Sequence, residues 1–262
     1  MTMILIASGL YLLATLLLAR NLAGDGMPPG RRWAIPAALA AGLHVGAHAR
    51  AWHAQGGVDL HFFAALSLVG FGMAVLTLAV AARGRMAALG VVVLPIAAAS
   101  ALGYGLYGPH VPEGLDWRLQ LHAWCALLAY ATLAVAAVLA VMLWLQERAL
   151  RRRDFQGWLR ALPPLTELEH LLFRTISVGF VLLTATLLTG AVFVSDLFSQ
   201  QLIHKTVLSV LSWLAFGALL VGRWRAGWRG ATAARWTLVA MALLVLAFFG
   251  SKFVIEMLLQ GR

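Results

Sequence analysis

Long apolar runs separated by short polar segments dominate the chain, and eight of them are long enough for a membrane-spanning helix. A hydrocarbon core of about 30 Å is crossed by roughly 20 apolar residues of α-helix. The runs cover residues 2–19, 33–52, 60–82, 87–107, 119–146, 167–194, 203–222 and 233–258. The pattern predicts an all-α, polytopic integral membrane protein with eight transmembrane helices in a single membrane domain, residues 1–262.

The segments between the runs contain the residues that end helices. The gap at 108–118 is rich in Gly and Pro and contains Glu113 and Asp116, which favours an exposed cap on the outer side of the membrane. Before the sixth run, a proline pair precedes Thr166, and Thr166 and Glu169 have the spacing of a capping box. The sixth helix is therefore expected to begin there.

Composition agrees with a membrane protein, since 62% of the residues are apolar and only 11% are charged. The net charge of +10 does not indicate a nucleic-acid partner, because the basic residues form short clusters between apolar runs. Large clusters fall in alternate loops: Arg20, Arg31 and Arg32; Arg83 and Arg85; Arg148, Arg151, Arg152, Arg153 and Arg160; Arg223, Arg225, Arg229 and Arg235. The intervening loops and the C-terminus contain Arg50, Arg118, Lys205 and Arg262. By the positive-inside rule, both termini are predicted outside a bacterial inner (plasma) membrane.

Several kinds of chemistry are absent from the sequence. Cys125 is the single cysteine, which excludes an internal disulfide and a cysteine-based zinc or iron–sulfur site. No Gly-rich phosphate loop, Ser-His-Asp order or paired carboxylate centre is present. A non-catalytic protein is therefore expected rather than an enzyme.

Two histidines enter apolar helices at matched depth. His122 begins the fifth run and His204 begins the seventh, so helix rise places both imidazoles within roughly 6 Å of the outer interface. Facing imidazoles are suitable axial ligands for haem iron in a helix bundle. Lys205, beside His204, would suit an anionic propionate, and aromatic residues that would suit a porphyrin face are Trp117, Trp124, Tyr130 and Trp213. The alternative is that these residues belong to the polar and aromatic belt at the membrane interface.

A second histidine group lies on and after the second run. His44 and His48 are four residues apart and share a helix face, and His44 is expected near mid-bilayer and facing the bundle. Either it has a functional role, such as lining an entry path, or it forms a hydrogen bond with a neighbouring Ser or Thr. With His53 and His61, the group is also compatible with a copper- or zinc-binding ladder. In the last run, Lys252 and Glu256 are predicted to form a structural pair.

Several motifs in order resemble the CcsA/CcmC/HemX cytochrome c assembly superfamily, and most closely its small YpjD-type branch. They are LHAWCALLAYATL (121–133), PPLTELEHLLFRTISVGF (163–180), GFVLLTATLLTGAVF (179–193), HKTVLSVLSW (204–213) and GWRGATAARWTLVAMALLVLAFFGSKFVIE (227–256). The resemblance implies a periplasm-facing haem platform in which His122 matches the histidine ahead of the family's tryptophan-rich loop. Here Ser195–Ile203 contains no tryptophan, and Lys252 and its neighbours stand where a further periplasmic histidine is expected. These differences favour haem binding, export or regulation over cytochrome c ligation.

The resulting hypothesis is a haem-handling membrane protein with non-covalent, b-type haem bound by His122 and His204 at the outer face. Lys205, Trp124 and His44 complete the predicted cofactor site. The bilayer and other membrane or cytochrome-assembly proteins are the expected partners. Two alternatives stay open: a metal-ion transporter or transporter accessory that uses the outer-half histidines, and a membrane scaffold without a cofactor.

Overall fold

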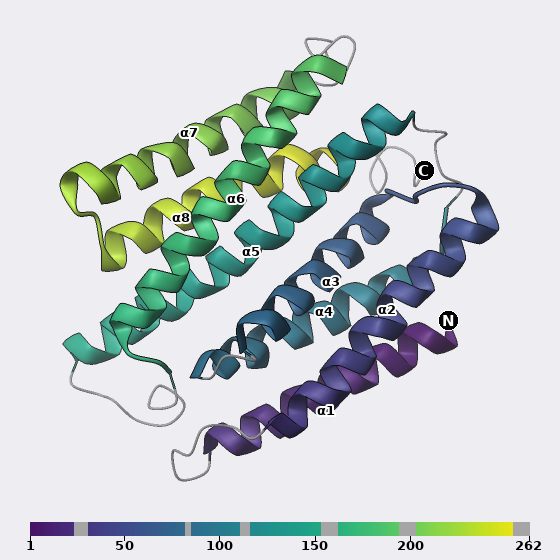
Figure 1. Ribbon diagram of the computed structural model, residues 1–262, viewed down its shortest axis with the longest axis horizontal. Coiled ribbons are helices and arrows are strands. Elements are labelled where there is room, and N and C mark those ends of the chain that lie inside the picture. The colour runs from purple at the N-terminus through teal and green to yellow at the C-terminus, as the bar shows by residue number, and fades with distance from the viewer. Residues whose placement is uncertain (24–30, 82–84, 111–115, 153–161, 194–202, 254–262) are drawn as a thin grey trace. The chain divides into compact units, whose positions relative to one another are not determined.

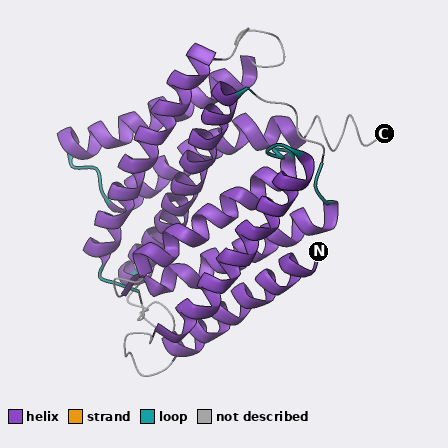
Figure 2. Ribbon diagram, turned by 45° about the vertical axis from the view of Figure 1, so that its right-hand side comes forward, coloured by secondary structure: helices purple, strands orange, loops and turns teal. Residues whose placement is uncertain are grey.

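The computed structural model describes residues 1–23, 31–81, 85–110, 116–152, 162–193 and 203–253, and these are almost entirely helical. The long helices are α1 (Thr2–Ala23), α2 (Ala34–Gln55), α3 (Phe62–Ala81), α4 (Ala88–Tyr107), α5 (Trp117–Arg151), α6 (Leu165–Phe193), α7 (Ile203–Ala226) and α8 (Gly230–Val245) (Figure 1). Short 3₁₀ turns, η1 (Arg31–Trp33) and η2 (Arg85–Ala87), precede α2 and α4, and a π-helical segment, η4 (Leu246–Gly250), continues α8. No strand occurs in the described residues (Figure 2).

Seven of these helices are long and apolar enough to cross a membrane: α1 and α3 to α7, and α8 together with η4. The predicted all-helical membrane architecture is confirmed, and each predicted run coincides with a helix. Helix α2 is the one described long helix outside this set, because His44, His48, Arg50 and His53 make it more polar. Eight complete spans and the outer location of both termini therefore stay predictions.

The described chain divides into two compact units. The first, called the N-terminal unit, comprises Met1–Glu113 with Leu145–Leu168 and is built around α1 to α4; the second, called the C-terminal unit, comprises Gly114–Trp144 with Glu169–Arg262 and is built around α5 to α8. In the N-terminal unit, α1 packs against α2 and α4, and α3 packs against α4 and α2. In the C-terminal unit, α7 packs against α8.

Small residues allow the helices to approach closely, as is common in membrane bundles. The core of the N-terminal unit contains Ala14, Ala37, Ala40, Ala97 and Ala98 around Tyr11, Leu18 and Leu94. Between α5 and α6, a Cβ atom added at Gly179 would lie 2.5 Å from Cδ2 of Leu133, so only glycine permits this approach. Large apolar side chains such as Val181, Leu188 and Val192 of α6 remain exposed, as expected for a surface that contacts lipid.

The start of α6 differs from the predicted cap. The helix begins at Leu165, where the amides of Glu167 and Leu168 donate to the carbonyl of Pro164. Thr166 thus lies inside the first turn, and the Glu169 carboxylate accepts a hydrogen bond from Arg223 of α7 at 2.5 Å. The capping-box prediction is wrong because the helix begins one residue before Thr166, which places this residue inside the first turn instead of at the N-cap.

Candidate functional site

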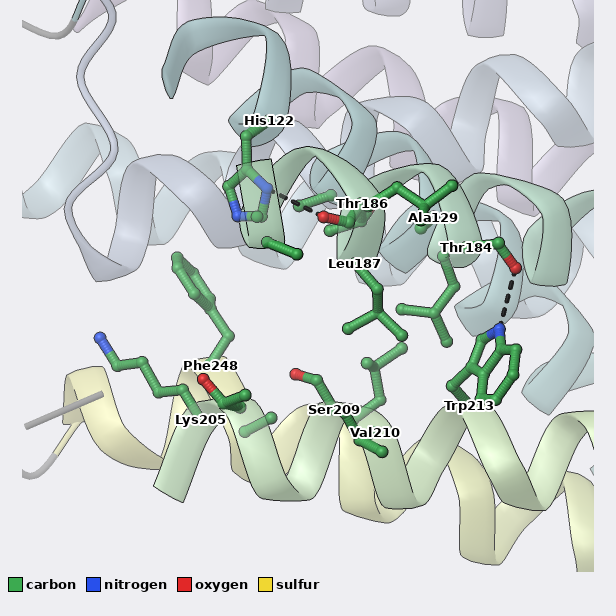
Figure 3. A pocket seen from close by; sticks show the side chains of 18 of the residues that line it. His122, Ala129, Thr184, Thr186, Leu187, Lys205, Ser209, Val210, Trp213 and Phe248 are labelled. Atoms are coloured by element: carbon green, nitrogen blue, oxygen red, sulfur yellow. Dashed lines mark hydrogen bonds between the residues drawn. The ribbon is translucent and has the colours of Figure 1, made fainter. Parts of the chain in front are cut away.

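A cavity of about 500 Å³ lies within the C-terminal unit, between α5 and α6 on one side and α7, α8 and η4 on the other (Figure 3). Its volume is typical of a small-molecule or cofactor pocket. Most of the lining is apolar, and the polar exceptions are few. The lining residues that matter for its chemistry are His122, Tyr130, Thr184, Gly190, Lys205, Ser209, Trp213 and Phe248.

His122 has a defined orientation in this cavity. Its Nδ1 atom is 3.1 Å from the backbone carbonyl oxygen of Thr186 and 3.2 Å from the hydroxyl of Thr189. A carbonyl oxygen can only accept, so this contact requires the proton on Nδ1 and leaves a lone pair on Nε2. Imidazoles that bind metal commonly donate their other nitrogen in this way. This orientation and tautomer would allow His122 to bind a metal ion through Nε2.

The space for this imidazole depends on Gly190 of α6. A Cβ atom added at Gly190 would lie 3.1 Å from Cε1 of His122, which is tighter than most van der Waals contacts, and 3.5 Å from its Nδ1. Because α6 also supplies the Thr186 carbonyl, a single helix both fixes the ring and makes room for it.

Aromatic side chains form much of the remaining wall. The indole N–H of Trp213 donates to the Thr184 hydroxyl at 2.9 Å, and its ring stacks on Phe180 with centroids 5.5 Å apart. The Tyr130 hydroxyl donates to the carbonyl of Leu244 at 2.5 Å, next to the segment where α8 passes into η4. A π-helical turn changes the backbone pairing of its helix, and Tyr130 satisfies a carbonyl there. These contacts fix aromatic side chains in the mainly apolar wall of the cavity.

The charge in the cavity is asymmetric. Figure 3 shows Lys205 and His122 toward one end and Trp213 toward the opposite end. A ligand that fits this arrangement is largely apolar and planar, has an electrophilic metal centre for an imidazole, and has an anionic group for an ammonium. Haem has these three properties, so the donor set fits that cofactor.

The structure brings together some of the residues predicted for the cofactor site. His122 and Lys205 both line the cavity. His204 precedes Lys205 in the first turn of α7. It is exposed and is not among the described lining residues, so its pairing with His122 stays a prediction. Trp124 is half-buried on α5, also outside the lining, and its predicted role likewise stays untested.

His44 belongs to the N-terminal unit and is completely buried, as its sequence position predicts. Its Nε2 atom is 2.7 Å from the hydroxyl of Ser67, which is also 3.0 Å from Nε2 of His48. On the other side, the Tyr11 hydroxyl is 3.4 Å from Nδ1 of His44. The hydrogen bond to a serine is the structural alternative that the sequence left open, whereas a role along an entry path stays a prediction.

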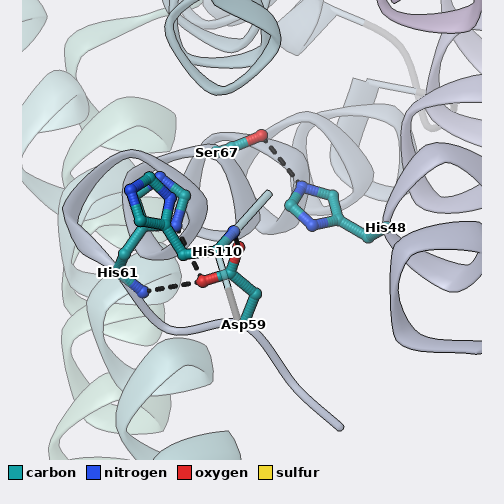
Figure 4. A network of polar contacts seen from close by, with 5 residues as sticks. All are labelled: His48, Asp59, His61, Ser67 and His110. Carbon is teal, nitrogen blue, oxygen red and sulfur yellow. Dashed lines mark hydrogen bonds and ion pairs between the residues drawn. The ribbon is translucent and has the colours of Figure 1, made fainter. Parts of the chain in front are cut away.

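A second polar cluster in the same unit contains Asp59, His61 and His110 (Figure 4). One carboxylate oxygen of Asp59 accepts from the backbone N–H and Nδ1 of His61 at 3.0 and 2.7 Å, and the other accepts from the backbone N–H of His110 at 2.8 Å. Burial alone would raise the pKa of Asp59, but these hydrogen bonds from His61 and His110 hold the pKa below its ordinary value. The carboxylate is therefore ionised at neutral pH.

Sequence reasoning placed His61 in a ladder with His44, His48 and His53, and it missed this grouping. His53 is exposed near the end of α2. His110 had no local signal, because it follows a different helix and meets Asp59 across 51 positions of sequence. The short spacing of Asp59 and His61 was the one clue available. In the last helix, Lys252 lies 5.6 Å from the Phe248 ring centroid, and its predicted partner Glu256 is outside the described residues.

Comparisons with known proteins show which family the chain belongs to. Residues 33–259 match the family model described as "Cytochrome C assembly protein". The chain is 31% identical to "Inner membrane protein YpjD" of Escherichia coli K12 over 238 residues, covering 86% of this chain and 89% of that protein. It is 26% identical to "Protein HemX" of Brevibacillus brevis over 50% of this chain and 49% of that protein.

A third relative is "Cytochrome c biogenesis protein CcsA" of Prochlorococcus marinus, which is 32% identical over 33% of this chain and 28% of that protein. No solved structure gives a significant match. The family model spans nearly the whole chain and includes every described long helix except α1. The chain therefore belongs to the cytochrome c assembly protein family.

Proposed function

We propose that this protein is a non-catalytic, haem-handling protein of the bacterial inner membrane that binds b-type haem non-covalently in the cavity of the C-terminal unit. Its task would be the export, presentation or regulation of haem during cytochrome c assembly. The observation that supports this most strongly is the fixed tautomer of His122, whose Nε2 lone pair is left for a metal in a mainly apolar cavity that also contains Lys205.

Each wall of the cavity has a distinct task in this proposal. His122 would bind the iron through Nε2, while the Thr186 carbonyl keeps the proton on Nδ1 and prevents the ring from turning. Lys205 would bind a propionate carboxylate through its ammonium group. Trp213 and Phe248 would cover the apolar ring system and exclude water. Haem supplies an iron atom with two axial positions when it is bound.

His204 remains the proposed second axial ligand. It precedes Lys205 at the start of α7, so it belongs to the same helix end as a lining residue. Trp124 and His44 stay part of the wider proposal, the first near the fifth helix entrance and the second along a path for the cofactor. None of these three is needed for His122 to bind haem, and the experiment below tests His204 separately.

The family membership supports the cellular context. The relative named for cytochrome c biogenesis and the relative named an inner membrane protein suggest the same setting for this chain. Its partners would then be the lipid bilayer and other membrane proteins of cytochrome assembly. The distribution of basic loops would place the entrance of α5 and the start of α7 on the outer face.

The test is a reduced-minus-oxidised and pyridine haemochrome spectrum of detergent-purified protein from haem-replete cells. We expect a Soret band and non-covalent haem in the wild type, and loss of both in His122→Ala. His170→Ala is the matched control, because His170 is an exposed histidine of the same unit outside the described cavity lining. Full haem content in His122→Ala, with the control intact, would show that this site is wrong.

Two further variants resolve the remaining ligands. If His204 is the second axial ligand, His204→Ala should convert a low-spin, six-coordinate spectrum to a high-spin one while haem stays bound. An unchanged spectrum would remove His204 from the site. Lys205→Ala should weaken haem binding by about tenfold or more, the equivalent of a charge-assisted hydrogen bond of about 1.5–3 kcal/mol.

A further inference from the structure

Two loops of the N-terminal unit bring Asp59, His61 and His110 together. Helix α2 ends at Gly56, which has a φ of 75° and donates its N–H to the carbonyl of Trp52 at 2.8 Å. Helix α4 ends at Gly108, which has a φ of 74° and donates to Tyr104 at 3.0 Å. A positive φ, which glycine adopts readily, turns the chain sharply at both positions. As a result, potential ligand atoms of Asp59, His61 and His110 all lie within 4.8 Å of one another.

Asp59 organises this cluster. Its two carboxylate oxygens hold His61 and the backbone of His110, as described above. Because the Asp59 carboxylate is an acceptor, the short contact at His61 Nδ1 requires the proton on that nitrogen and leaves the lone pair on Nε2. A carboxylate that orients a histidine in this way is the usual outer partner of a metal-bound imidazole.

The second nitrogen of His61 provides an independent observation. The His61 side chain is only 10% exposed, and its Nε2 atom is buried without a hydrogen-bond partner in the described part of the chain. A buried polar atom without a partner is costly unless something binds it. The His110 ring is nearby, with its centroid 4.2 Å from that of His61.

The occupant must be small. Axial ligands of haem approach the iron from opposite faces of a porphyrin, and two rings with centroids 4.2 Å apart leave no room for a porphyrin between them. A single ion fits better. Bonds of about 2.0–2.2 Å place the ligand atoms of a tetrahedral ion roughly 3.3 Å apart, so the cluster has to contract by an ångström or so. His110 is exposed, and rotation of its side chain can supply that movement.

We propose that Asp59, His61 and His110 form a binding site for a divalent first-row transition metal ion such as Zn²⁺. The two imidazoles are its nitrogen ligands, and the Asp59 carboxylate is the anionic group that fixes them and offsets the charge of the ion. Nitrogen donors favour zinc or copper over Mg²⁺ and Ca²⁺, which prefer oxygen ligands. Two protein ligands leave coordination positions open for water, so the ion is exchangeable. This inference does not rest on the haem proposal, because its residues belong to the N-terminal unit.

The test uses the full chain in detergent, purified without a histidine tag, stripped with a chelator and titrated with Zn²⁺ by calorimetry. We expect one Zn²⁺ per chain, with binding weakened by at least about tenfold in His61→Ala and His110→Ala and by about 10–100-fold in Asp59→Asn. His53→Ala is the matched control and should bind as the wild type does, because His53 is an exposed histidine outside the cluster. A Mg²⁺ titration should show no comparable binding.

Folding is checked separately by circular dichroism, by elution volume, and with His61→Gln, which keeps a polar side chain of similar reach. A folded His61→Gln that has lost Zn²⁺ binding supports the site. The proposal is overturned if the wild type fails to bind Zn²⁺ stoichiometrically, or if folded His61→Ala and His110→Ala retain its affinity. Loss of binding in His53→Ala alone would also overturn it, in favour of a histidine ladder along α2.

Discussion

Replacing Ser67 by alanine should destabilise the N-terminal unit by about 1–3 kcal/mol, because one buried hydroxyl serves two imidazoles. Ser67 is completely buried, and its Oγ atom is within hydrogen-bond distance of Nε2 of both His44 and His48. A serine hydroxyl has one proton to donate, so it donates to one ring and accepts from the other. If Tyr11 donates to Nδ1 of His44, then His44 donates to Ser67 and Ser67 donates to His48.

The magnitude follows from these two hydrogen bonds. A buried polar group left without a partner costs about 1–3 kcal/mol in soluble proteins. Interhelical hydrogen bonds in membranes are worth less, on average about 0.6 and at most about 1.7 kcal/mol. Two such bonds are lost together in Ser67→Ala, and the retained 5.6 Å contact between the rings of His44 and His48 does not replace them. Two bonds of about 0.6–1.7 kcal/mol each sum to about 1–3 kcal/mol, the same range as the estimate from soluble proteins.

The assay is reversible unfolding in mixed detergent micelles, followed by circular dichroism. Ser177→Ala is the matched control, since the Ser177 hydroxyl bonds to the Phe173 carbonyl of its own helix at 2.9 Å. Its expected effect is within about 0.5 kcal/mol of wild type. A double-mutant cycle with His44→Ala should give a coupling energy of about 0.5–1.5 kcal/mol between positions 44 and 67.

Stability equal to wild type in Ser67→Ala, with no coupling to position 44, would refute the reasoning. His44 would then be held by other contacts, and its burial would need a functional explanation. A measurable coupling between positions 44 and 67, together with unchanged haem content in His44→Ala, would instead show that His44 has a structural role.

Three further predictions use the same unfolding assay or the haem spectrum. Glu169→Gln should lower the free energy of unfolding by about 2–3 kcal/mol, because it leaves Arg223 without its carboxylate partner. Glu147→Gln should lower it by at most about 0.5 kcal/mol, because the arginine that Glu147 pairs with is 77% exposed. Equal effects of the two variants would contradict this prediction. Gly190→Ala should reduce bound haem by displacing His122, and a wild-type spectrum would contradict the proposed contact. Tyr130→Phe should lower stability by about 1 kcal/mol through loss of its bond to a backbone carbonyl, and an unchanged midpoint would argue against that bond.

The positions of the helices could be predicted from sequence because a bilayer imposes a length. Every backbone polar group must be satisfied within the span, so about 20 apolar residues become a helix whatever surrounds them. The predicted run at 87–107 and helix α4, Ala88–Tyr107, differ by one residue at the start. Helix ends were harder to predict: α6 begins at Leu165, before the expected cap at Thr166, and Glu169 pairs with Arg223 of another helix.

The depth of a residue in the membrane could also be predicted from the sequence, but the direction in which its side chain points around the helix axis could not. Each residue advances about 100° around an α-helix, so neighbours at nearly equal depth face different directions. His204 and Lys205 illustrate this: the sequence placed both at the entrance of α7, and the structure exposes the first and turns the second into the cavity. Which side chains share a cavity is decided by how the helices pack.

The sequence by itself determined an all-helical membrane protein, the location of its helices and the burial of His44, while the role of His122 as a haem ligand stays a prediction. Tertiary structure decided the partners: the Thr186 carbonyl for His122 across 64 positions, Ser67 for His44 across 23, and Asp59 for His110 across 51. Local patterns record which face or depth a residue occupies, whereas these contacts depend on the register and rotation of separate helices. For that reason the grouping of Asp59, His61 and His110 appeared only once the chain was folded.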